Sequence, residues 1–102
     1  MRIIKQSFLK EIAEKYPLAA PSIAIWVRII RAAIWKTSTD VRAVIRSADP
    51  VRVKSGNTVW VFNIQQNNFR LIAAIHFDKQ RVYTLRFLTH AEYSKGGWKK
   101  EL

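Results

Sequence analysis

The sequence predicts an α+β domain in which two N-terminal helices are followed by an antiparallel sheet of three to five strands. In the first half, apolar residues recur at helical spacing. The second half contains short runs that are rich in β-branched and aromatic residues, as is typical of strands. Apolar residues make up 49% of the 102 residues, which is enough for a packed core. With 3 glycines, 3 prolines and no repeat, the chain has no linker, and residues 1–102 are predicted to form one domain.

Two helices are predicted in the first half, over residues 6–16 and 22–36. Pro17 ends the first helix, and Pro21 precedes the second. The apolar stripe of the second helix consists of Ile23, Trp26, Val27, Ile30 and Ile34. Ile25 and Ile29 lie off this stripe, and two explanations stay open: a second buried face, or a docking surface for another chain. Thr39 and Asp40 are then expected to cap one short turn that runs to Ile45.

The second half predicts an antiparallel meander, because short polar loops join its strand-like runs. The predicted strands are residues 51–54, 58–64, 69–77 and 81–88, with residues 2–4 as a further strand at the sheet edge. Side chains alternate between the two faces of a strand. The face that meets the helices is predicted to hold Trp60, Phe62, Ile64, Phe69, Leu71, Ala73, Ile75, Phe77, Tyr83, Leu85 and Phe87. The other face is predicted to hold Val59, Val61, Asn63, Arg70, Ile72, Ala74, His76, Val82, Thr84, Arg86 and Leu88.

Strand register brings polar side chains together at one end of this second face. If Ile64 opposes Phe69 and Phe77 opposes Arg81, the residues that converge are Asn63, Arg70, Arg86 and His90. Their convergence depends on that register, since a slip of one residue reverses the faces.

These residue types suit the cleavage of a phosphodiester. The guanidinium groups of Arg70 and Arg86 can hold a phosphate and offset the charge that develops on it. The imidazole of His90 can exchange a proton, and Tyr93 can stack on a base. RNA supplies its own nucleophile, the 2′-hydroxyl, so no metal is required. His76 lies six residues from Arg70, about 20 Å along the strand, and cannot share the site.

A structural role for the same residues stays open on geometry alone. Arginines on the exposed face of a strand are usually only solvated, and a histidine that follows a strand is usually a turn or cap residue.

The charge of the chain points to a polyanion or an acidic protein as partner. Eighteen Lys and Arg residues stand against seven Asp and Glu residues, a net charge of +11. The excess is spread over both halves of the sequence. A basic protein without a polyanionic partner is the alternative.

The seven carboxylates form no cluster for Mg²⁺, and no metal or other cofactor is expected. With no cysteine, no signal peptide and no membrane-length apolar segment, the chain is expected to be cytoplasmic and not membrane-bound.

Several segments resemble the HigB toxin family of the RelE-like superfamily of messenger-RNA interferases. They are Val61-Phe62-Asn63-Ile64, Asn68-Phe69-Arg70-Leu71-Ile72, Leu88-Thr89-His90-Ala91-Glu92-Tyr93, and in the first half Arg2-Ile3-Ile4 and Glu14-Lys15-Tyr16-Pro17. A helix that bears Trp26, Ala33 and Trp35 also agrees, and the similarity covers about residues 1–98.

The resemblance implies the RelE-like fold, with two helices on a curved antiparallel sheet. It also implies a type II toxin that cleaves messenger RNA, in many relatives on the translating ribosome. A cognate antitoxin, usually a helix-turn-helix DNA-binding protein, would neutralise it. Arg70 matches the strand arginine that contacts RNA, His90 and Tyr93 match the terminal motif, Arg86 is a further candidate, and Lys54 is a candidate phosphate contact.

Two positions depart from the family pattern. Relatives often have Gly-Asn before the arginine strand, where this chain has Gln66-Asn67-Asn68, and the changed turn is expected to affect the register. Relatives often have Asp after the tyrosine, where this chain has Ser94. Two alternatives to an endoribonuclease follow: a non-catalytic RNA- or ribosome-binding module, and a degenerate toxin that acts only through its antitoxin.

Overall fold

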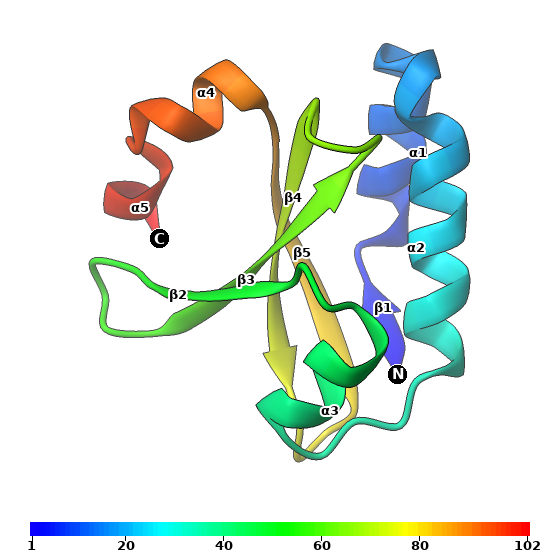
Figure 1. Ribbon diagram of the computed structural model, residues 1–102, viewed down its shortest axis with the longest axis vertical. Helices are drawn as coiled ribbons and strands as arrows, with labels where there is room; N and C mark the ends of the chain where they lie inside the picture. Colours follow the sequence, from blue (N-terminus) through cyan, green and yellow to red (C-terminus); the bar gives the residue numbers. More distant parts are fainter.

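The computed structural model describes residues 1–102, and its elements form a sheet with helices on both faces (Figure 1). The elements in chain order are β1 (Arg2–Ile4), α1 (Gln6–Lys15), a 3-10 turn (Pro17–Ala19), α2 (Ala20–Ala32), α3 (Ser38–Val44), β2 (Asp49–Arg52), β3 (Thr58–Ile64), β4 (Phe69–His76), β5 (Arg81–Thr89), α4 (His90–Lys95) and α5 (Trp98–Glu101). Helices α1 and α2 lie against one face, and α4 and α5 lie on the other side of the strands.

The five strands are arranged in the order β1-β5-β4-β3-β2. Strands β2 to β5 pair antiparallel with their neighbours, whereas β1 pairs parallel to β5 at the sheet edge. The predicted α+β class is therefore confirmed, including the edge strand. No helix is long and apolar enough to cross a membrane.

The main core lies between α1, α2 and the sheet. Phe62 from β3 is 1% exposed, and the Trp26 ring of α2 meets it edge to face at 5.4 Å between centroids. Trp60, Ile64 and Leu71 are also buried here, as their alternation predicts. Each such side chain stabilises the fold by about 1.5–3 kcal/mol through burial.

Helix α2 ends earlier than its periodicity predicts. Ala33 takes an extended conformation, with φ −75° and ψ 142°. The Met1 ammonium group donates to the carbonyls of Ile30 and Ala33, which satisfies groups left open at the helix end. Because the chain leaves the helix there, the placement of Ile34 on the buried stripe is wrong: it is 78% exposed, and Trp35 is buried instead.

Two further features of the helices concern the isoleucines off the main stripe and the cap of α3. Ile29 is half-buried and packs on the main core, whereas Ile25 is 54% exposed. The cap of α3 is Thr37 and not Thr39: the Thr37 hydroxyl accepts from the Asp40 amide, and the Asp40 carboxylate accepts from the Thr37 amide. The backbone N–H groups of Lys36 and Thr37, which both donate to the Asp40 carboxylate, lower the pKa of Asp40.

The register of β4 and β5 changes once along their length. Near the predicted site Arg70 pairs with Leu88 as expected, but at the hairpin His76, and not Phe77, pairs with Arg81. The loop is thus one residue longer than the tight hairpin. A β-bulge at Leu85, which has no partner across from it, restores the register.

This bulge reverses the faces of the first part of β5. Val82 and Thr84 are buried on the helix-facing side, at 0% and 4% exposure. Tyr83 and Leu85 face the other way, so their prediction as core residues is wrong. Strict alternation predicts the wrong faces here, because the extra residue Leu85 moves each residue before it in β5 to the opposite face of the sheet.

The second face of the sheet is not open along its whole length. Val59, Val61 and Ile72 face away from α1 and α2 as predicted, yet they are buried with Val53 and Trp98 in a second core. Trp98, from α5, is 4% exposed. The C-terminal segment, residues 96–102, therefore covers the middle of this face and leaves the ends of the strands accessible.

Candidate active site

Arg70 lies at the uncovered end of the second face and is held by four neighbours. Its Nη1 donates to the carbonyls of Asn67, at 2.9 Å, and Phe69, at 3.2 Å. Its Nη2 lies 3.4 Å from Nδ1 of His90, and its guanidinium carbon lies over the Tyr93 ring, 5.2 Å from the centroid. Arg70, His90 and Tyr93 thus form one group, which we call the Arg70 cluster, and the guanidinium is oriented before any ligand arrives.

His90 is the first residue of α4, and its position is fixed by backbone contacts. Its amide donates to the Asn68 carbonyl at 3.0 Å. Arginine can only donate hydrogen bonds, so its contact with Nδ1 requires this nitrogen to accept. The proton of the neutral ring then lies on Nε2, and the ring itself is exposed to solvent.

The turn between β3 and β4 positions both members of this pair. Its Asn67 carbonyl holds Arg70, and its Asn68 carbonyl holds the His90 amide. Gln65 and Gln66 take left-handed conformations, with φ 49° and 60°, which close the turn without glycine. The register that the Gln66-Asn67-Asn68 departure was expected to disturb is unchanged, since Asn63 pairs with Arg70.

Ser94 does not contact the histidine ring. Its hydroxyl donates to the His90 carbonyl, one helical turn back, at 2.9 Å. It therefore supports the backbone of α4 and leaves the orientation of the His90 ring to Arg70.

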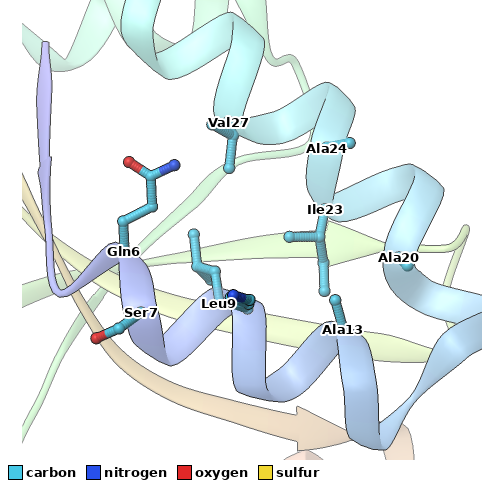
Figure 2. Close-up of a pocket in the computed structure, with 9 residues that line it drawn as sticks. Gln6, Ser7, Leu9, Ala13, Ala20, Ile23, Ala24 and Val27 are labelled. Atoms are coloured by element: carbon cyan, nitrogen blue, oxygen red, sulfur yellow. The ribbon is translucent and has the colours of Figure 1, made fainter.

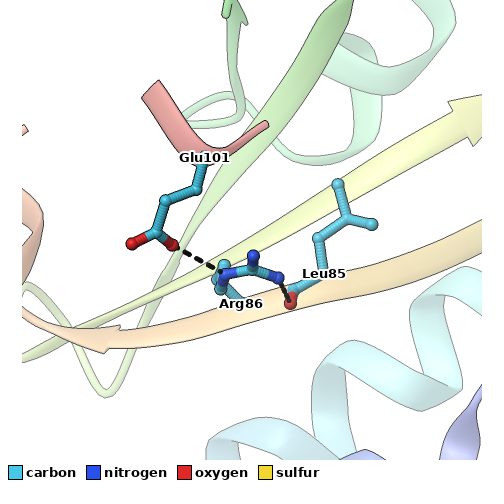
Figure 3. Close-up of polar contacts among 3 residues, drawn as sticks. All are labelled: Leu85, Arg86 and Glu101. Atoms are coloured by element: carbon cyan, nitrogen blue, oxygen red, sulfur yellow. Dashed lines mark hydrogen bonds and ion pairs between the residues drawn. The ribbon is translucent and has the colours of Figure 1, made fainter. Parts of the chain in front are cut away.

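Arg86 lies diagonally from Arg70 on the same face, as predicted, about 7–8 Å away between the strand positions. Its guanidinium turns toward the C-terminal segment: Nε is 3.4 Å from the Glu101 carboxylate, and Nη1 donates to the Leu85 carbonyl at 2.8 Å (Figure 3). Both side chains of the ion pair are substantially exposed, so water screens their attraction. Arg86 therefore occupies a neighbouring cleft with Glu92 and Lys95, of about 290 Å³.

The two remaining predicted contacts are placed differently. Asn63 is exposed beside Arg70 on β3 and has no hydrogen bond to it. Lys54 lies outside β2, which ends at Arg52 and not at the predicted residue 54. Its amide donates to the Lys99 carbonyl at 3.0 Å, near the end of β3 that is distant from Asn63. The structure therefore separates Lys54 from the Arg70 cluster.

The largest cleft in the molecule, about 500 Å³, lies between α1 and α2 (Figure 2). Six of its nine lining residues are apolar, and three of these are alanines, whose small side chains leave space between the helices. It contains none of the predicted site residues. No group of three or more His, Asp or Glu side chains is arranged to hold a metal ion.

A capping box at the start of α4 supports His90. The Thr89 hydroxyl accepts from the Glu92 amide at 3.2 Å, and the Glu92 carboxylate accepts from the Thr89 amide at 3.0 Å. That backbone hydrogen bond lowers the pKa of Glu92 below its ordinary value of 4.5.

The Glu92 cap predicts a pH-dependent stability. A carboxyl with a lowered pKa in the folded state stabilises the protein above pH 4.5, and this contribution is lost as the pH falls through the folded pKa. Glu92→Gln keeps the capping hydrogen bond but does not titrate. Urea unfolding at pH 7 and pH 3 should therefore show wild type losing more stability than Glu92→Gln. Glu11→Gln, on the exposed side of α1, is the control, and equal losses in Glu92→Gln and wild type would contradict the prediction.

Comparison with known proteins agrees with this fold. Residues 19–96 match the model of the HigB toxin family, described as the RelE-like toxic component of a toxin–antitoxin system. The chain belongs to this family. It is 31% identical over 93 residues to the mRNA interferase toxin HigB of Escherichia coli K12, covering 91% of this chain and 88% of the relative. It is 30% identical over 95 residues to the mRNA interferase HigB of Escherichia coli O6:H1, covering 93% and 90%.

As a member of the HigB family, the protein is the toxin component of a toxin–antitoxin system, and a cognate antitoxin is implied. The family match includes Arg70, His90 and Tyr93 but stops at residue 96. Helix α5, with Trp98 and Glu101, lies beyond it.

Sequence reasoning missed three contributors to the site. The capping box was readable, because Thr89-His90-Ala91-Glu92 has the spacing of the capping motif. Trp98 gave a weaker signal, as a lone aromatic residue after two glycines. The Asn67 and Asn68 carbonyls gave none, because backbone groups carry no residue-specific pattern.

Proposed function

We propose that this toxin is a metal-independent endoribonuclease that cleaves messenger RNA on the translating ribosome. The observation that carries the proposal is the Arg70 cluster, in which a pre-oriented guanidinium touches an exposed imidazole on an accessible sheet face. The names of the relatives, mRNA interferases, support the same activity.

In the proposed reaction the 2′-oxygen of RNA attacks the adjacent phosphorus and the bond to the 5′-oxygen breaks. Arg70 binds the scissile phosphate and stabilises the charge of the phosphorane. When the guanidinium binds the phosphate, Nδ1 of His90 is free to accept the proton of the attacking 2′-hydroxyl, and the imidazolium then returns a proton to the leaving 5′-oxygen. Arg86 binds a neighbouring phosphate, and Asn63 and Lys54 contact the RNA. Tyr93 contacts a base with its exposed edge, because its ring already packs against Trp98 and Arg70. The products carry a 2′,3′-cyclic or 3′-phosphate and a 5′-hydroxyl.

The proposed protein partner is an antitoxin with an acidic segment that covers part of the basic surface, in a protein with a helix-turn-helix DNA-binding fold. The support is the net charge of +11, which favours an acidic partner by long-range attraction.

The test is a reconstituted translation reaction in which messenger-RNA 5′ ends are mapped with and without the purified protein. New ends inside the coding region support the proposal. Ribosome binding with an intact message would overturn it in favour of a binding module, and a lack of growth arrest when the protein is expressed without antitoxin would favour a degenerate toxin. If isolated RNA is also cut, cleavage should persist with EDTA.

The Arg86–Glu101 pair predicts a gain of RNA affinity in one variant. Glu101→Gln removes the carboxylate that neutralises Arg86, so we expect single-stranded RNA to bind a few-fold more tightly at low salt. The slope of log affinity against log salt should steepen by about 0.7, the value for one more phosphate contact. Fluorescence anisotropy with a labelled oligonucleotide measures both. Glu11→Gln, which removes the same charge far from Arg86, should leave the salt slope unchanged.

A further inference from the structure

The ring of Tyr93 has two partners, and they come from different parts of the chain. The Arg70 guanidinium of β4 lies over it at 5.2 Å, and the Trp98 indole of α5 stacks on it at 5.4 Å between centroids with an angle of 19° between the planes. The Tyr93 ring thus links the indole to the guanidinium that also touches His90.

Trp98 is itself held firmly. It is 4% exposed and packs with Val53, Val59 and Ile72 in the second core. Its Nε1 donates to the Tyr93 carbonyl at 3.1 Å, so Trp98 contacts both the ring and the backbone of Tyr93. Because Trp98 is buried and makes both contacts, it restricts the positions that the half-buried Tyr93 ring can take.

The segment that carries Trp98 is fixed on one side to the loop between β2 and β3 and on the other side to β5. The Lys99 carbonyl accepts from the Lys54 amide, and Glu101 pairs with Arg86. Gly96, with φ 75°, turns the chain at the end of α4, so that α5 folds back over the sheet. These contacts hold the indole in place against the Arg70 cluster.

We propose that Trp98 is a positioning residue of this toxin: through its stack on Tyr93 it holds the Arg70 guanidinium in the orientation that the scissile phosphate requires. This inference rests on the proposed ribonuclease function. It assigns a role in that function to α5, which lies outside the matched part of the family. Because a small misplacement of a catalytic group has a large kinetic effect, removing the stack should reduce kcat more than it changes KM.

The experiment compares cleavage kinetics in wild type, Trp98→Phe, Trp98→Ala and Val53→Ala. We expect Trp98→Ala to lower kcat about tenfold to a hundredfold, and Trp98→Phe, which keeps a ring against Tyr93, to restore most of it. Val53→Ala opens the same second core but leaves both rings of the Tyr93–Trp98 stack intact, and it should keep the wild-type kcat. Circular dichroism at the assay temperature establishes that each variant is folded.

A double-mutant cycle separates positioning from general stability. In a Tyr93→Ala background the stack is already lost, so adding Trp98→Phe or Trp98→Ala should reduce kcat no further. Full additivity, or equal kcat losses in Trp98→Ala and Val53→Ala, would overturn the positioning role. A wild-type protein that does not cleave RNA would instead overturn the proposed function, so the two failures are distinguishable. If Trp98→Ala is unfolded, Trp98→Leu takes its place in the kinetics and in the cycle, because leucine fills the second core but cannot stack on Tyr93.

Discussion

Arg70→Ala should reduce messenger-RNA cleavage about 10²–10³-fold, the usual effect of removing one group that stabilises charge in a transition state. The loss should appear in kcat as well as in RNA affinity, because the guanidinium acts on the phosphorane and also orients His90. Arg70→Lys should recover little, since an ammonium cannot donate two parallel, coplanar N–H groups to a phosphate. Mapping of 5′ ends in the reconstituted translation reaction measures the rate.

His90→Ala should reduce the same rate by about 10²–10⁴-fold, the range for general acid–base catalysis. The two controls remove similar groups elsewhere. Arg42→Ala removes an exposed charge on α3, and His76→Ala removes the other histidine at the far end of β4. Both should leave the cleavage sites and kcat close to wild type. If His90→Ala cleaves as fast as wild type, the imidazole has no part in the chemistry and the proposed mechanism is wrong.

Phe62→Ala should lower the free energy of unfolding by about 3–5 kcal/mol. Phe62 is 1% exposed and packs against Trp26, so truncation removes buried apolar area and leaves a cavity that α2 and the sheet cannot easily close. A domain of this size has only about 5–15 kcal/mol of stability. We expect a decrease in Tm of roughly 4–8 °C for each kcal/mol lost.

The control for this substitution is Leu18→Ala, at a side chain that is 77% exposed in the turn before α2. Its effect should stay within about 0.5 kcal/mol. Urea unfolding monitored by circular dichroism measures both variants. An effect of Phe62→Ala as small as that of Leu18→Ala would show that the Phe62 side chain does not hold α2 on the sheet.

The sequence predicts those parts of the fold that depend on local pattern. The α+β order, the strand β1 at the edge and the alignment of Asn63 with Arg70 follow from periodicity and short loops. The end of α2 does not follow from local pattern. Trp35 is buried in the core, and the Met1 ammonium group, from a distant part of the chain, donates to the carbonyl of Ile30 at the end of the helix. Such tertiary contacts override local helix preference.

The sequence predicts which residues lie at the candidate site better than it predicts which groups their side chains contact. Arg70, His90 and Tyr93 stand together because Arg70 pairs with Leu88 near the end of β5, and α4 begins two residues later at His90. The orientation of Arg86 toward Glu101 depends on α5, whose fold over the second face is set by Trp98. No alternation rule reveals that a short C-terminal segment covers a sheet face.

The β-bulge at Leu85 divides the β4–β5 hairpin into two halves that can evolve separately. A change of one residue in the loop between these strands alters the pairing of the distal half, and the bulge can take up or release that residue. The half that carries Arg70 and Arg86 keeps its alignment. Insertions and deletions among homologues should therefore accumulate at the exposed residues Asp78 and Lys79, while the spacing from Arg86 to His90 stays constant. The tip of the hairpin can in this way change in length while the pairing of Arg70 with Leu88 and of Ile72 with Arg86 is kept.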